Sequence, residues 1–133
     1  MKKTLTALAF AIVATAGAAP ALAQSAGQWS IESTLLSGRS WNTLQVCLKE
    51  DNTWYSIEQR KGSGRWMPAG NHVLFHGALD TLSVSADLVV TGRGVMTGNV
   101  QQWVNNSLTA DNQSNLFATS RWTFVSATCA SAF

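Results

Sequence analysis

Hydrophobic and polar residues alternate along most of this chain, which is the pattern of half-buried β-strands. No stretch after residue 27 carries an apolar stripe at helical spacing. In the clearest segment, the apolar residues lie two positions apart and share one predicted face: Leu82, Val84, Ala86, Leu88 and Val90. The same period of two gives one inward face to residues 28–33 and another to residues 43–48: Trp29, Ile31 and Ser33, then Leu44, Val46 and Leu48.

Turn-forming residues separate these segments at intervals of about ten residues, as in chains of short hairpins. Clusters of Gly, Asn, Asp, Pro or Ser stand at residues 37–39, 50–52, 61–64, 68–71, 92–94, 105–107 and 111–115. About seven or eight strands with short loops predict an all-β fold, a small antiparallel up-and-down β-barrel. A β-sandwich is the alternative. The barrel is favoured because short loops leave little length for long crossovers, and closure removes exposed strand edges.

The N-terminal segment predicts a leader for export rather than a part of the fold. Two lysines precede an apolar run over residues 5–14, and residues 21–23 form a small-x-small cleavage site. The run is too short for a membrane anchor, and Gln24 is not the cysteine that a lipoprotein needs. We therefore expect a signal peptide over residues 1–23, a single barrel domain over residues 24–133, and a periplasmic or secreted location.

Removal of this leader would change the charge of the protein. The chain has 9 Lys and Arg, 7 Asp and Glu, and a formal net charge of +2. Loss of Lys2 and Lys3 leaves 7 basic and 7 acidic residues, so the net charge falls to 0. A neutral surface without a basic cluster lacks the main driving force for binding nucleic acid or anionic membranes. We expect neither partner.

The two cysteines of the chain, Cys47 and Cys129, predict a disulfide bond, because thiols are oxidised in exported proteins. Cys47 falls on the polar face of its predicted strand, a position that suits a bridge to a crossing C-terminal tail. Closing a loop of this length removes unfolded-state entropy worth about 4–5 kcal/mol. Two sulfurs alone do not supply the four ligands of a zinc site, so no metal is expected.

Six tryptophans are many for so small a domain, and each must bury a large ring while pairing an indole N–H. One interpretation is that they fill the barrel and cap its ends. The other is that several line an internal cavity of a few hundred Å³, typical of barrels that hold a small apolar ligand. The residues proposed to line such a cavity are Trp41, Trp54, Trp66 and Trp103.

The motif Gly27-Gln28-Trp29 opens the first predicted strand, and Ser120-Arg121-Trp122 lies on the last long one. This pairing resembles the end-capping arrangement of calycin barrels, the group of lipocalins, avidins and bacterial metalloprotease inhibitors. The resemblance implies that Arg121 lies across Trp29 and closes the barrel base. The chain departs from the inhibitors in its short N-terminal arm and widely spaced cysteines, and it lacks the Thr-Asp-Tyr type motif of lipocalins.

The sequence offers no catalytic constellation. His72 and His76 lie four residues apart on one predicted strand, about 13 Å, which is too far for both to ligate one metal ion. A serine nucleophile in its characteristic strand–helix turn is also absent. We therefore expect neither an enzyme nor a cofactor.

Together these features predict an exported, lipocalin-like barrel that binds a small apolar or aromatic ligand. The alternative is an envelope protein-interaction module or hydrolase inhibitor that acts through its loops. Residues 60–64 and 111–115 are the loops most suited to a protein partner, because they are polar and long enough to project. The oligomeric state stays open.

Overall fold

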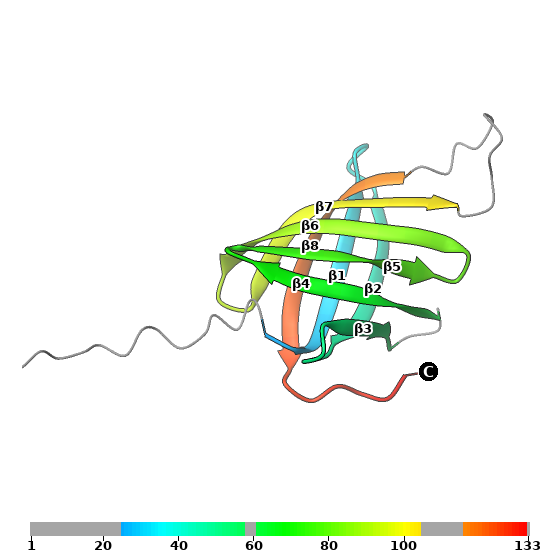
Figure 1. The fold of residues 1–133 in the computed structure, drawn as a ribbon. Coiled ribbons are helices and arrows are strands. Elements are labelled where there is room, and N and C mark those ends of the chain that lie inside the picture. Colours follow the sequence, from blue (N-terminus) through cyan, green and yellow to red (C-terminus); the bar gives the residue numbers. More distant parts are fainter. Residues whose placement is uncertain (1–24, 58–60, 105–115, 133) are drawn as a thin grey trace, which may run out of the picture.

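The chain forms a closed, eight-stranded antiparallel β-barrel in a computed structural model that describes residues 25–57, 61–104 and 116–132 (Figure 1). The predicted leader lies outside these ranges, which contain no helix long and apolar enough to span a membrane. The strands follow one another around the barrel in chain order: β1 (Gly27–Leu35), β2 (Ser40–Leu48), β3 (Thr53–Ser56), β4 (Gly62–Ala69), β5 (His72–Leu79), β6 (Leu82–Gly92), β7 (Val95–Val104) and β8 (Leu116–Ser126).

Each strand pairs antiparallel with its chain neighbours, and β1 also pairs with β8, which closes the barrel. The predicted up-and-down barrel is therefore confirmed, and the sandwich alternative is wrong. Alternation explains which side chains face inward. Along β1 the residues Trp29, Ile31 and Ser33 are buried, whereas Glu32 between them is exposed. The inward faces of all eight strands meet in one core, because a closed sheet has a single interior.

The predicted turns at residues 37–39 and 50–52 are confirmed, and those predicted at 68–71 and 92–94 are shorter, at 70–71 and 93–94, because β4 runs to Ala69 and β6 to Gly92. The turns predicted at residues 105–107 and 111–115 lie outside the described residues. Residues 61–64 are an exception, because β4 begins at Gly62 and continues through Gly64. A Cβ on Gly64 would lie only 2.1 Å from the carbonyl oxygen of His76. Glycine stands there because another strand packs closely against it, and the sequence does not distinguish this from a turn.

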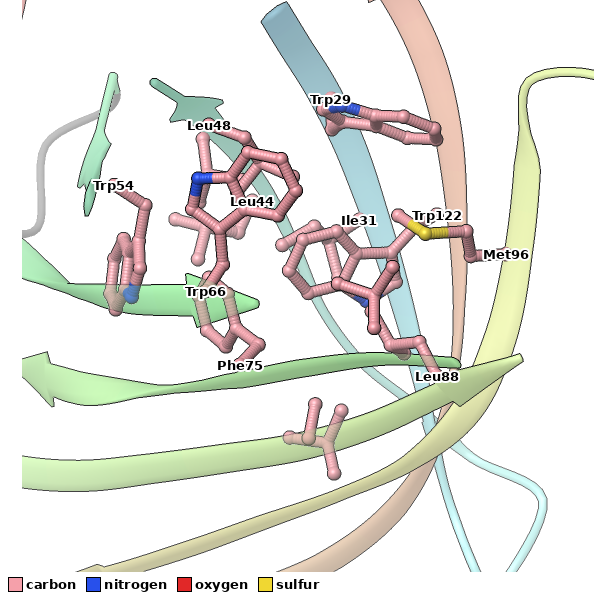
Figure 2. Close-up of a cluster of buried hydrophobic side chains, with 14 of the residues drawn as sticks. Trp29, Ile31, Leu44, Leu48, Trp54, Trp66, Phe75, Leu88, Met96 and Trp122 are labelled. Atoms are coloured by element: carbon pink, nitrogen blue, oxygen red, sulfur yellow. The ribbon is translucent and has the colours of Figure 1, made fainter. Parts of the chain in front are cut away.

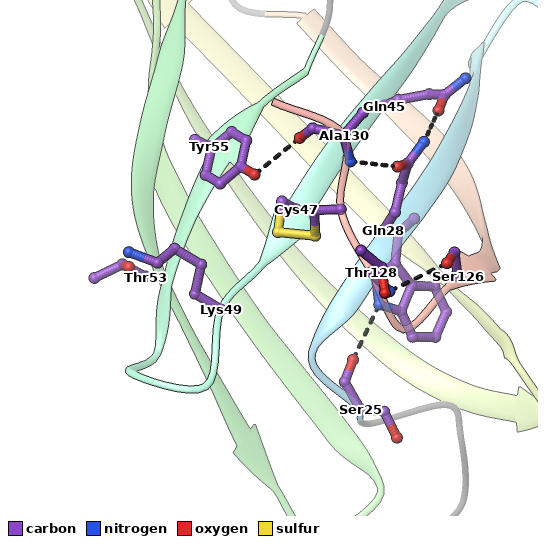
Figure 3. Close-up of a disulfide and its surroundings, with 12 residues drawn as sticks. Ser25, Gln28, Gln45, Cys47, Lys49, Thr53, Tyr55, Ser126, Thr128 and Ala130 are labelled. Carbon is purple, nitrogen blue, oxygen red and sulfur yellow. Dashed lines mark hydrogen bonds between the residues drawn. A yellow bond between two sulfur atoms is a disulfide. The ribbon is translucent and has the colours of Figure 1, made fainter. Parts of the chain in front are cut away.

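The predicted disulfide is confirmed. Cys47 lies on the outer face of β2 and bonds to Cys129 in the C-terminal tail, with their Cα atoms 5.7 Å apart (Figure 3). Two hydrogen bonds hold the same tail: the Tyr55 hydroxyl donates to the Ala130 carbonyl at 2.9 Å, and the Ala130 N–H donates to Gln28 Oε1 at 3.0 Å. The tail therefore lies across the outside of β1, β2 and β3 and leaves the interior to other side chains.

Candidate functional site

Tryptophan packing fills one end of the barrel, which we call the closed end and which carries the turns at residues 49–52, 70–71 and 93–94. Trp29 has an exposed fraction of 0% there, and its ring meets Phe124 edge-on with centroids 5.3 Å apart. Its indole N–H donates to the carbonyl of Ser25 at 3.1 Å. The chain entering β1 therefore satisfies the polar atom of the ring that closes this end.

Arg121 does not take part in this closure, contrary to the expectation from the calycin resemblance. Trp122 faces the interior, so its neighbour Arg121 faces outward, and the Arg121 side chain is exposed. In the register of β1 with β8, Arg121 pairs with Glu32 while Trp29 pairs with Phe124. Arg121 cannot share the inward face with Trp122, because adjacent residues of a strand point to opposite faces of the sheet.

Trp54 and Trp66 belong to the packed core rather than to a cavity (Figure 2). Trp54 stacks on Phe75 with centroids 4.3 Å apart, and its N–H donates to the carbonyl of His76 at 2.9 Å. The Trp66 N–H donates to the carbonyl of Lys49 at 2.9 Å. Both rings are thus fixed by packing and by their own hydrogen bonds, as the space-filling interpretation of the tryptophans predicts.

The opposite end, which we call the open end, carries the loop at residues 36–39 and the turn at residues 80–81. A cavity lies in the interior there, with an apolar wall and a mouth toward solvent. Phe75 and Trp122 meet edge-on at 4.8 Å between centroids and form part of its wall. The other lining residues are Ile31, Ser33, Trp41, Leu44, Leu79, Val84, Ala86, Val100 and Gln102.

This cavity is far smaller than the few hundred Å³ expected from the tryptophan content. Only about 20 Å³ is open to a water-sized sphere, which is the space of about one water molecule. The total gap between side chains reaches about 350 Å³ when it is counted out to the solvent at the mouth. The large rings that were expected to surround a cavity mostly occupy the space instead.

The structure describes the side chains of three of the four tryptophans predicted to line a ligand cavity, and one of these three lines the recess. Trp41 lines the cavity and is half-buried, while Trp54 is part of the core. Trp66 is likewise a core residue. The backbone of Trp103 belongs to β7, opposite Ser83 of β6, and its side chain lies outside the described part of the structure.

Polar atoms of the cavity region come from three strands. The Ser33 hydroxyl donates to Ser120 Oγ at 3.3 Å, and the Trp122 N–H donates to the same oxygen at 2.9 Å. Gln102 has an exposed fraction of only 2%, and its Oε1 atom has no hydrogen-bond partner. The sequence could have indicated Gln102, because it continues the inward series of β7 that contains Met96 and Val100.

The remaining titratable candidates lie on the outer surface. His72 pairs with Asp87 at 2.8 Å between Nδ1 and Oδ1, and both side chains are about half exposed. His76 is exposed on the same strand. Hydrogen bonds from the Thr53 hydroxyl and N–H lower the pKa of Asp51 in the turn before β3. These groups are dispersed around the barrel and do not converge on the cavity.

Fold and cavity together define a class of protein, a small up-and-down β-barrel that is filled at one end and has an apolar recess at the other. Comparisons with known protein families, with curated proteins and with solved structures find no match for this chain. Residues 111–115 and Arg60 lie outside the described residues, whereas residues 62–64 belong to β4, so the prediction of a projecting loop over residues 60–64 is wrong for that part. The apolar recess at the open end is therefore the main candidate site in the described part of the chain.

Proposed function

We propose that this protein binds a small, apolar or aromatic molecule in the mouth of the barrel at the open end. The observation that carries the proposal is the change in packing along the barrel. Aromatic side chains pack against one another at the closed end, whereas at the open end they leave an apolar recess beside the half-buried Trp41. Ligand sites in small barrels are typically recesses of this composition at the barrel mouth.

The recess as it stands has space for about one water molecule, so even a ligand of one or two aromatic rings must lie in the mouth of the recess and move Trp41 aside. A larger molecule would have to displace Phe75 or Trp122, which are held in the core by ring contacts. Trp41 is less constrained, since it lies at the start of β2 directly after a loop. Complete burial of about 150–250 Å² of ring surface at about 25 cal/mol per Å² gives about 4–6 kcal/mol before the cost of association, so the dissociation constant is expected to be no tighter than about 0.05 mM.

Titration of the ¹⁵N-labelled protein with indole, benzofuran and naphthalene tests this proposal by NMR. We expect saturable shifts of the amide signals of Trp41, Phe75 and Val100. The variant Ala86→Leu places a larger side chain in the recess and should abolish the shifts. Ala69→Leu, on the exposed end of β4, is the matched control and should leave them unchanged. Absence of saturable shifts, or equal shifts in Ala86→Leu, would refute the proposal.

The location proposed for this activity is the periplasm or the extracellular space. The Cys47–Cys129 bond supports an oxidising compartment, because such bonds are rare where thiols are kept reduced. The predicted leader supports the same location. Mass spectrometry of the protein exported by a bacterial host tests it: we expect a mature chain beginning at Gln24 with the bond formed.

Binding of an envelope protein is the second candidate, and one observation favours it. Leu36 and Phe117 have exposed fractions of 77% and 50%, and both border a surface hollow of about 420 Å³ at the open end. Exposed apolar side chains at one rim are typical of protein-binding sites. If this candidate is correct, Leu36→Ser combined with Phe117→Ser abolishes inhibition of an envelope hydrolase. If the variant still inhibits, this candidate is wrong.

A further inference from the structure

Gln102 is a buried polar residue in the wall of the recess. Its side chain lies on β7, two residues before the strand ends, and it lines the recess with an exposed fraction of 2%. Two buried side-chain oxygens in the described residues lack a hydrogen-bond partner, Ser56 Oγ and Gln102 Oε1. Of these two, only Gln102 lines the recess. An amide oxygen buried without a donor is unfavourable, so a donor that reaches it gains binding free energy.

Two donors among the residues that line the recess are already used in hydrogen bonds to Ser120. The Ser33 hydroxyl donates to Ser120 Oγ, and the Trp122 N–H donates to the same atom. Neither proton is directed to Gln102. The lining residues in the described part of the chain also include no Lys, Arg or His. The wall of the recess therefore contains a buried acceptor oxygen without a partner, and the lining residues in the described part of the chain carry no positive charge.

We propose that the site selects neutral aromatic molecules that carry an N–H or O–H donor, and that Gln102 Oε1 accepts this hydrogen bond. The inference rests on the proposed binding function and specifies the chemistry of its ligand. A molecule of the same shape with an oxygen acceptor in place of the donor would bring two acceptors together. A carboxylate would meet the same acceptor without a cation to offset its desolvation. Both kinds of molecule bind more weakly.

Indole and benzofuran make a matched pair for the test, because the ring N–H of indole is replaced by an oxygen in benzofuran. Their dissociation constants are measured by NMR titration of the wild type and of Gln102→Met, which keeps the length of the side chain and removes the amide. The control is Gln101→Met, which changes a neighbouring residue of the same strand that faces the outside. Loss of the hydrogen bond corresponds to at least about fivefold weaker binding.

We expect the wild type and Gln101→Met to bind indole at least fivefold more tightly than benzofuran, and Gln102→Met to bind the two equally. If the wild type binds both ligands with equal affinity, or if Gln102→Met keeps the preference, the donor inference is wrong although the binding function stands. If neither ligand binds to any of the three proteins, the binding function itself fails and the inference fails with it.

Discussion

The Trp54 ring packs directly against two glycines, so a larger residue at either position should destabilise the fold. Gly64 of β4 and Gly77 of β5 face each other across the sheet, and the indole ring lies over both. A Cβ added at Gly77 would lie 2.6 Å from Trp54 Cζ2 and 2.3 Å from the carbonyl oxygen of Ser63. Real Cβ atoms do not approach other atoms so closely, so Gly77→Ala must displace the ring and the neighbouring backbone.

The expected loss of stability in Gly77→Ala has two sources, the strained packing of the core and the weakened hydrogen bond of the Trp54 ring. Forcing extra volume into a packed core costs about 1–3 kcal/mol. Trp54 has an exposed fraction of 1%, and its N–H···O bond to His76, 2.9 Å long, contributes about 1 kcal/mol. Gly77→Ala should therefore lower the free energy of unfolding by about 2–4 kcal/mol.

Urea unfolding followed by far-UV circular dichroism measures this change. Gly92→Ala is the control, because the nearest atom to its added Cβ is 4.0 Å away and its backbone lies outside the left-handed region. We expect the control to change the unfolding free energy by less than about 0.5 kcal/mol. In a Trp54→Leu background the smaller side chain makes room, so Gly77→Ala should cost less there. Equal stabilities of Gly77→Ala and Gly92→Ala would refute this account of the packing.

Three further predictions concern the disulfide, the recess and one turn. Replacing both Cys47 and Cys129 by Ala should lower the unfolding free energy by up to about 4–5 kcal/mol, and an unchanged urea midpoint would contradict the entropic argument. Gln102→Met should stabilise the ligand-free protein by about 1–3 kcal/mol, because it removes a buried oxygen without a partner; thermal unfolding measures this, and a destabilised variant would show that the amide is satisfied. The pKa of Asp51 is lowered by hydrogen bonds from Thr53, so its contribution to stability is present above its unfolded pKa of 3.8 and is lost as the pH falls through the lower folded value. Urea midpoints between pH 2 and 5 should accordingly fall less steeply in Asp51→Asn than in the wild type, and identical slopes would exclude this role.

The sequence by itself determined the barrel. Alternation such as that from Leu82 to Leu88 assigns one face of a strand to the interior, and short turns leave few ways to connect neighbouring strands. The disulfide followed from the number of cysteines and the expected compartment. These features are local or combinatorial, so one chain without a structure was enough to predict them.

The tertiary structure decided which side chains occupy the interior space. Ring packing depends on register, and register brought Phe124 rather than Arg121 against Trp29. The volume left for a ligand is the small difference between the size of the barrel and the size of its contents, and a sequence pattern does not give that difference. The same holds for Gln102, whose polar atom can be judged unpaired only when every neighbour across the barrel is known.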